Sequence, residues 1–281
     1  MPVGRTDRKR QQIESLVSNA LELLPSHGGT LVEFCAGGGY CGLLVAALRP
    51  DVLVYLTDMN AISLKFAESK ARKYGLNNVY LSVFPMQWIV QRNEVEHNVD
   101  DDRDEIDVDV ETDRGVTSTT KVIPPKKMPR IFDVGVALHA CGSSSDVVMR
   151  ICMQSKASFV ICPCCYGSIK HCYSQEVYHV VDERRRFGDL RYPQSSTFQQ
   201  AGWEAELFGS LCRRADGKFW AHDERVSSKS GYHKEGVLAM RAVDTDRLLY
   251  ARECGYIANN RYMPSSASIK NHVLVGVQSS G

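Results

Sequence analysis

Val32-Glu33-Phe34-Cys35-Ala36-Gly37-Gly38-Gly39-Tyr40 is the stretch that decides the fold of this 281-residue chain. The apolar residues before the glycines are typical of a buried strand, and residues 40–49 are typical of a helix. Glycine between them lets the backbone turn sharply and approach a ligand closely. The start of the helix then presents unpaired N–H groups and a favourable dipole to that ligand. The stretch therefore predicts a strand, turn and helix that bind a nucleotide-like cofactor.

The rest of the sequence alternates apolar strands with amphipathic helices, beginning with a helical segment over residues 8–26. Strands are expected at 31–35, 52–57, 79–84, 131–138, 158–162, 256–263 and 272–277. Further helices are expected at 61–74 and 146–155 and within 175–187 and 234–254. Because the strands are nearly continuous apolar runs, helices should cover both faces of their sheet. The pattern predicts one α/β domain over residues 1–281, with a doubly wound, mostly parallel seven-stranded sheet that ends in an antiparallel hairpin.

Charge is distributed unevenly along the chain, whose net charge is +1. Residues 94–114 contain eleven acidic residues and two arginines, a net charge of −9 that leaves the remainder at +10. This composition, with few aromatic residues and with prolines at its far end, predicts a disordered acidic insertion at about 94–129. The insertion either folds over the basic surface as a phosphate mimic or keeps the protein soluble, and we favour the second interpretation.

A second carboxylate, Asp58, follows the second strand 25 residues after Glu33. A carboxylate at this place can accept hydrogen bonds from both hydroxyls of a ribose. Gly37, Gly39 and Gly42 also satisfy the G-x-G-x-x-G fingerprint of dinucleotide-binding proteins. The carboxylate of Glu33, however, suits a cationic cofactor that carries an amino-acid group, and it repels a pyrophosphate. A dinucleotide, or a fold that has lost its ligand, remains as an alternative.

The same segment resembles the first motif of class I methyltransferases, an acidic residue followed by spaced glycines. That resemblance implies a Rossmann-like fold and S-adenosylmethionine as the cofactor. The residues implied to bind this cofactor are Glu33, Cys35, Gly37, Gly38, Gly39, Asp58, Met59, Met86, Gln87 and His139. Cys35 departs from the pattern, because it stands where the first glycine is usual.

Two cysteine-rich segments close the fourth and fifth strands, Val-Ala-Leu-His-Ala-Cys-Gly at 136–142 and Ile-Cys-Pro-Cys-Cys-Tyr-Gly at 161–167. Ligands of a doubly wound sheet bind beyond the carboxyl ends of neighbouring strands. We therefore expect His139, Cys164 and Tyr166 to lie near the transferred methyl group and to act as catalytic residues.

Three interpretations of the cysteines stay open. They pack as small hydrophobic residues, they line the slot for the methyl acceptor, or they bind zinc. A zinc site would use residues from the set Cys141, Cys164, Cys165, Cys172, His139 and His171. Two adjacent cysteines seldom share one tetrahedral ion, so no metal is predicted.

Three segments identify a more specific likeness: 33–39, 138–142 and 162–167 resemble the methyltransferase domain of the glutathione S-transferase C-terminal domain-containing proteins. Residues 191–195, 246–247 and 253–256 look similar too, and the likeness extends over about 8–278 outside the acidic insertion. It implies a methyltransferase. The transferase-like part of that family has no counterpart in this sequence, so nothing about glutathione is carried over.

Leu-His-x-Cys-Gly and the Cys-Cys strand end are also similar, more distantly, to tRNA 2′-O-methyltransferases and to a ribosomal RNA methyltransferase-like group. This similarity implies RNA, either tRNA or rRNA, as the methyl acceptor and RNA modification as the function. Basic residues such as Arg5, Arg8, Lys9 and Arg10 form either a phosphate-facing surface or a solvated one. The alternatives are a methyltransferase for small molecules or proteins, and a non-catalytic scaffold.

The ten cysteines lie mainly on predicted strands and strand ends, an arrangement that favours a reducing compartment. The polar N-terminus predicts no secretory signal, and the sequence contains no run of 18 apolar residues. We therefore expect a cytoplasmic protein, with the nucleus as the alternative location. We expect it to have no association with a membrane and no specific protein partner.

Overall fold

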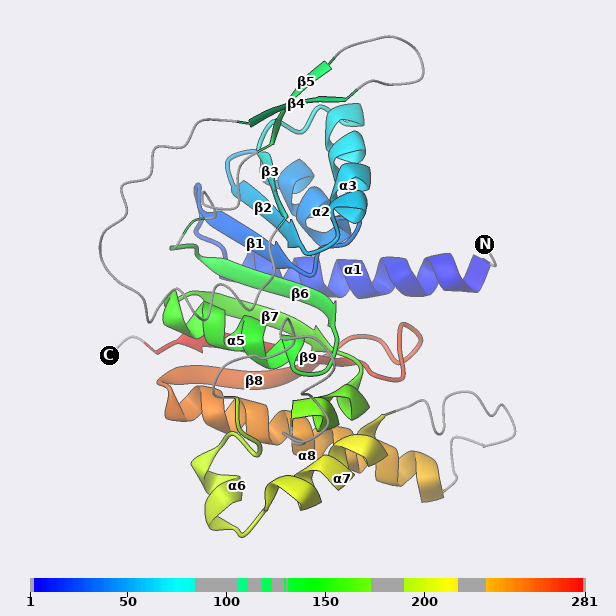
Figure 1. Cartoon of the computed structure of the whole chain (residues 1–281), viewed down its shortest axis with the longest axis vertical. Helices are drawn as coiled ribbons and strands as arrows, with labels where there is room; N and C mark the ends of the chain where they lie inside the picture. The colour runs from blue at the N-terminus through cyan, green and yellow to red at the C-terminus, as the bar shows by residue number, and fades with distance from the viewer. Residues whose placement is uncertain are drawn as a thin grey trace.

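The computed structural model describes residues 3–83, 106–110, 118–122, 129, 131–172, 190–216 and 231–279. The strands of its main sheet are β1 (Thr30–Phe34), β2 (Leu53–Asp58), β3 (Val79–Val83), β6 (Val134–Ala140), β7 (Ser158–Pro163), β8 (Tyr256–Tyr262) and β9 (His272–Gln278). Their order is β3-β2-β1-β6-β7-β9-β8 (Figure 1). Neighbouring strands are parallel from β3 to β7, whereas β9 runs antiparallel to both β7 and β8. The predicted seven-stranded α/β sheet with its antiparallel end is confirmed.

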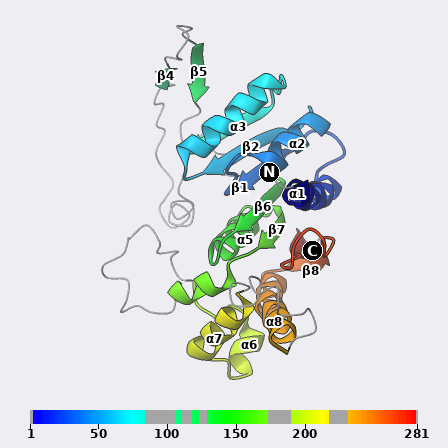
Figure 2. The same ribbon diagram turned by 90° about the vertical axis from the view of Figure 1, so that its right-hand side faces the viewer.

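Helices cover both faces of this sheet (Figures 1 and 2). One face carries α1 (Val3–Leu23), α2 (Tyr40–Leu48) and α3 (Ala61–Lys73). The other face carries α5 (Ser144–Gln154) and α8 (Gly231–Glu253), and α7 (Ala205–Ala215) packs against α8. The short helix α6 (Ser196–Gln200) also contacts α8, and the 3₁₀ helix η2 (Tyr166–Cys172) follows β7 and contacts α7. The sheet is therefore the middle layer of three.

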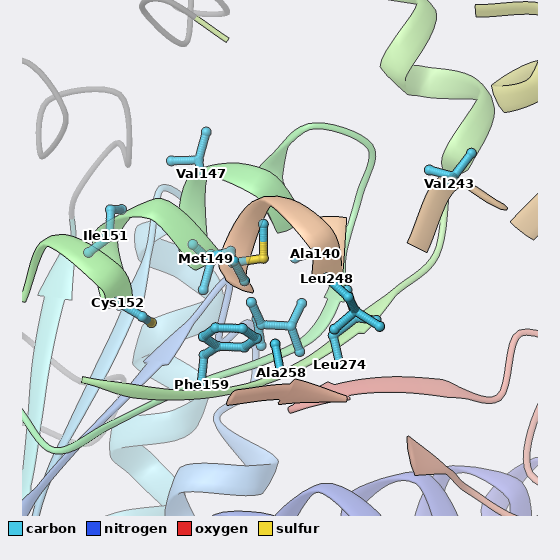
Figure 3. Close-up of a cluster of buried hydrophobic side chains, with 14 of the residues drawn as sticks. Ala140, Val147, Met149, Ile151, Cys152, Phe159, Val243, Leu248, Ala258 and Leu274 are labelled. Carbon is cyan, nitrogen blue, oxygen red and sulfur yellow. The ribbon is translucent and has the colours of Figure 1, made fainter. Parts of the chain in front are cut away.

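Apolar side chains fill both interlayer spaces. Between α5, α8 and the sheet, Phe159 of β7 lies beside Met149, Leu248 and Leu274 (Figure 3). A Cβ atom on Gly276 of β9 would lie 2.2 Å from Cζ of Phe159, so only glycine leaves room for this ring. The aromatic residue and the glycine opposite it thus fix how β7 and β9 pair.

In the first half of the chain, the structure shows which residues begin and end the predicted helices and strands. Asn60 caps α3, because its side-chain oxygen accepts hydrogen bonds from the N–H groups of Ile62 and Ser63. Gly75 follows the helix with a φ of +64°, the left-handed conformation that commonly ends helices. The strands and helices predicted up to residue 162 are confirmed with small shifts at their ends. The N-terminal helix differs most, because α1 begins at Val3 and ends at Leu23.

The second half of the chain and the acidic insertion contain elements that were not predicted, namely η2, α6, α7 and a two-stranded antiparallel sheet. That sheet consists of β4 (Ile106–Val110) and β5 (Ser118–Val122) and lies within the segment predicted as disordered. The remainder of the insertion except residue 129, and the helix expected within 175–187, lie outside the described residues. A single domain over 1–281 stays a prediction. Among the described helices, none combines the length and apolar character required to span a membrane.

Candidate functional site

The glycine turn after β1 is joined to the end of β2 by hydrogen bonds. The N–H of Ala36 donates to the carbonyl of Thr57 over 3.0 Å, and the N–H of Gly37 donates to Oδ2 of Asp58 over 2.8 Å. Gly37 and Gly39 have φ values of +53° and +67°, which glycine adopts without the steric cost that a side chain brings. The predicted turn and the predicted carboxylate are therefore in direct contact at the carboxyl edge of the sheet.

The glycines of this segment have different surroundings. A Cβ on Gly39 would lie 2.6 Å from Cδ1 of Leu56, and a Cβ on Gly42 would lie 2.3 Å from Cδ2 of the same side chain. Both glycines thus allow α2 to pack closely on β2. A Cβ on Gly37 would meet no atom within 4 Å. Gly37 borders open space, which is the room that a ligand needs in order to approach the backbone.

Lys70 of α3 holds Gly38 in place. Lys70 donates from Nζ to the carbonyl of Gly38 over 3.1 Å, and the same ammonium lies 3.8 Å from the centre of the Tyr40 ring. This cation–π contact and the hydrogen bond together hold the turn against the helix that packs beside it.

Asp58 retains capacity to bind a ligand. Its Oδ2 accepts from Gly37 and its Oδ1 accepts from the N–H of Asn60 over 2.8 Å. A carboxylate offers about four acceptor positions, and the side chain is half-buried, so two further hydrogen bonds can form. The neighbouring Met59 is 69% exposed and can cover a flat ring. These features fit the ribose and base of an adenosine-containing cofactor.

Glu33 lies deeper than the sequence alone indicates. Its side chain is buried, and Oε2 accepts from the N–H of Gly42 over 2.7 Å. Burial raises the pKa of Glu33 to about 7, although hydrogen bonds from Gly42 and Cys41 and the charge of Lys9 act in the opposite direction. The carboxylate therefore holds the first turn of α2, and its contact with a cationic ligand stays a prediction.

Cys35 and His139 both adopt left-handed backbone conformations, with φ values of +52° and +64°. Cys35 directly follows β1, and His139 is the second-last residue of β6, which pairs with β1. Among the described non-glycine residues, only Lys156 shares this conformation. The value at Cys35 explains why glycine is usual at this position of the methyltransferase motif. Such strain often accumulates at ligand sites.

His139 contacts α1. Its Nε2 lies 3.1 Å from Oε1 of Gln12, and Nε2 of Gln12 donates to the carbonyl of Ala267 over 2.8 Å. Because Oε1 can only accept, the ring proton is assigned to Nε2, and Nδ1 carries the lone pair. Loss of surrounding water, followed by the charges of Lys9 and Lys270, lowers the pKa of His139. The neutral imidazole with a basic Nδ1 is therefore the favoured form.

A cavity of about 1140 Å³ opens beside His139, between the first turns of α1, the start of α2 and residues 267–270. Its lining is strongly basic, with Glu14 as the one acidic residue among those that line it. The basic lining residues are Arg5, Arg8, Lys9, Arg10 and Lys270. The cavity therefore suits a ligand with several negative charges.

Three cysteines meet where β6 and β7 end. The Sγ atoms of Cys141 and Cys164 are 3.1 Å apart, those of Cys164 and Cys165 are 3.6 Å apart, and all three lie within 4.8 Å of one another. The structure thus brings the predicted Cys164 together with the thiols of both strand ends.

Tyr166 differs from its prediction as a catalytic residue. The side chain is 1% exposed, and its hydroxyl donates to Oδ2 of Asp244 over 2.7 Å. Asp244 also contacts His272 and Arg247, and Arg247 binds Asp146 through two hydrogen bonds of 2.8 Å. Burial raises the pKa of Tyr166 further from neutrality. Tyr166 therefore belongs to a buried charged network that supports the end of β7. Its hydroxyl is not open to a ligand.

Two predicted cofactor residues, Met86 and Gln87, lie outside the described residues. Gln12 and Lys270 border the site without having been predicted. Nothing in their local sequence marks them, because Gln12 reaches the site only once α1 has packed beside β6, and Lys270 only once the β8–β9 loop has reached the end of β7.

Comparison with known proteins gives one family match, to a model described as a methyltransferase domain, over residues 8–172. A glutathione S-transferase C-terminal domain-containing protein homolog of Drosophila melanogaster is 30% identical over 98% of this chain and 37% of its own length. The glutathione S-transferase C-terminal domain-containing protein of Homo sapiens is 30% identical over 99% and 34%. The chain thus spans about a third of the length of these relatives.

Among solved structures, the magnesium protoporphyrin IX methyltransferase of Synechocystis aligns with 98% of this chain over 86% of its own length. It does so with a TM-score of 0.45 and 9% identity.

Proposed function

We propose that this chain, which belongs to the methyltransferase domain family, transfers a methyl group from S-adenosylmethionine to RNA. The observation that carries this proposal is the basic cavity beside His139. RNA presents one phosphate charge per nucleotide, so a set of cations at the mouth of the site favours it over a neutral acceptor.

The donor half of the proposed site is the turn between β1 and α2. Asp58 would accept hydrogen bonds from the ribose hydroxyls, and the open face of Gly37 would admit the amino-acid end of the cofactor. When bound there, S-adenosylmethionine supplies an electrophilic methyl group on a sulfonium. The chain would accelerate transfer mainly by holding donor and acceptor in line.

The acceptor half of the proposed site begins at His139. Its neutral ring, with the proton on Nε2, presents Nδ1 as a base for a hydroxyl or amino group of the acceptor. Gln12 and the backbone of Ala267 hold the ring in this tautomer. His139 would therefore both position the acceptor and remove its proton as the methyl group arrives.

The basic side chains of α1 would position the acceptor through its phosphates. Arg5 and Arg8 line the cavity, and Nε of Arg8 donates to the carbonyl of Gly4 over 3.2 Å. Each neutralised phosphate contributes to binding that weakens as salt rises. An RNA acceptor therefore predicts a steep salt dependence, which a small neutral acceptor would not produce.

The test combines labelled S-adenosylmethionine with separated cellular RNA, protein and metabolite fractions. We expect label in RNA, and RNA binding that falls steeply between about 50 and 200 mM salt. Replacing Arg5 and Arg8 by alanine should reduce the salt slope by about 2 while calorimetric donor binding is kept. The matched control replaces two α3 lysines outside the cavity lining, Lys65 and Lys73, and should change the slope less. Label confined to the protein or metabolite fraction would contradict the RNA proposal.

A further inference from the structure

The three thiols at the ends of β6 and β7 form a cluster of a kind that proteins use to hold a thiophilic metal ion. Cys141, Cys164 and Cys165 come from two neighbouring strands, and their sulfur atoms all lie within 4.8 Å. No disulfide joins these three thiols or any other cysteine whose side chain the structure describes. Sulfur atoms at such separations can share one ion, because each Zn–S bond is about 2.3 Å long.

Packing alone does not account for the arrangement. Buried cysteines that pack as small apolar residues, such as Cys152, lie within the core, whereas Cys141 is exposed and the other two are half-buried. A divalent cation can hold three thiols that lie this close together, since a coordinated thiol loses its proton to the metal.

We propose that Cys141, Cys164 and Cys165 together bind one zinc ion, with the fourth coordination position open to solvent or substrate. Three protein ligands and an open position are the pattern of reactive zinc sites, whereas structural sites use four protein ligands. Among the described side chains, which do not include those of His171 and Cys172, no fourth ligand joins the cluster.

The adjacency of Cys164 and Cys165 does not prevent shared coordination here. The chain turns at this point, because the N–H of Tyr166 donates to the carbonyl of Cys164 and that of Ser168 donates to the carbonyl of Cys165. The turn brings the two sulfur atoms to 3.6 Å. Tetrahedral geometry with bonds of about 2.3 Å requires sulfur separations of about 3.8 Å, so shifts of roughly 1 Å or less suffice.

The surrounding charge also fits. Three thiolates and one zinc ion carry a net charge of −1, and the ammonium of Lys270 donates to the carbonyl of Cys164 over 2.9 Å. A positive charge beside an anionic metal cluster stabilises it. Exposure of Cys141 leaves a path by which an ion or an exogenous ligand reaches the site.

The first experiment measures zinc in the full chain after zinc supplementation and gel filtration. We expect one zinc per chain in the wild type and a loss of affinity of at least about tenfold in each of Cys141→Ser, Cys164→Ser and Cys165→Ser. Cys254→Ser, at an exposed thiol after α8, is the matched control and should keep the zinc. Far-UV circular dichroism establishes that each variant is folded.

A second experiment tests the open position in the wild type. Cobalt substitution should give thiolate-to-cobalt charge-transfer absorption, and added azide should shift the cobalt bands. Substoichiometric zinc in the wild type, unchanged zinc in all three variants, or a Cys141–Cys164 disulfide in protein that has been given zinc would overturn the proposal. Bands that azide does not move would overturn its open position. Donor binding is measured separately by calorimetry, so failure here leaves the methyltransferase assignment untouched.

Discussion

Replacement of Glu33 by glutamine tests how the donor turn is built. The carboxyl of Glu33 is buried and accepts from the N–H of Gly42, and glutamine keeps an oxygen at that place. Burial raises the pKa from 4.5 to about 7. At about 1.4 kcal/mol for each pKa unit, the ionised form costs the folded state about 3 kcal/mol relative to the protonated form.

The sign of the pH dependence follows from proton binding. Between pH 4.5 and 7, the folded chain holds the Glu33 proton more tightly than the unfolded chain does. The free energy of unfolding contributed by this proton is therefore present in full below about pH 4.5 and is lost as pH rises through 7. Glutamine does not titrate, so Glu33→Gln should gain on the wild type by up to about 3 kcal/mol over this window.

The measurement is urea unfolding of the wild type and Glu33→Gln at several pH values from 5 to 8. The matched control is Glu206→Gln, at an exposed carboxyl on α7, which should leave the pH dependence of the wild type in place. A difference between Glu33→Gln and the wild type that stays constant from pH 5 to 8 would refute the argument.

Three further predictions concern the buried network, the glycine turn and the proposed base. Arg247→Met should lower the free energy of unfolding by about 3–5 kcal/mol in urea titrations, because it leaves the buried carboxylate of Asp146 without its cationic partner. Gly39→Ala should lower the melting temperature more than Gly37→Ala, since only the first Cβ meets neighbouring atoms although both φ values are positive; equal losses would count against the packing argument. His139→Asn should slow methyl transfer by about 100-fold or more while calorimetric donor affinity changes far less, and an unchanged rate would remove the proposed base.

The sequence predicts the parallel sheet well because each of its strands is a short apolar run between recognisable turns. The glycine turn was predictable for the same reason, since Gly37 and Gly39 mark a backbone that must turn left-handedly. The carboxylate of Asp58 was found from its place after β2. These signals are local, and the fold adds little to them.

What could not be predicted depends on residues distant in the chain. Tyr166 follows a cysteine-rich strand end and looks reactive, yet its hydroxyl donates a hydrogen bond within the core to Asp244, 78 positions further on. Gln12 reaches His139 across 127 positions. Composition does not reveal such contacts, because they exist only once α1, α8 and the sheet have packed.

The cysteines of the thiol cluster are visible in the sequence, but the distances between their sulfur atoms are not. Adjacent cysteines argued against a shared ion, whereas the turn at Tyr166 brings both sulfurs to the same side as Cys141. Only the path of the backbone after β7 decides whether these sulfur atoms lie apart or together.

Calorimetric titration of the purified chain with S-adenosylmethionine tests the central claim most directly. The structure predicts one binding site per chain, and a loss of affinity of about tenfold or more in Asp58→Ala, because the carboxylate would no longer accept from the ribose or brace Gly37. Absence of measurable heat with the cofactor and with its demethylated product, or equal affinity in the two proteins, would contradict the account.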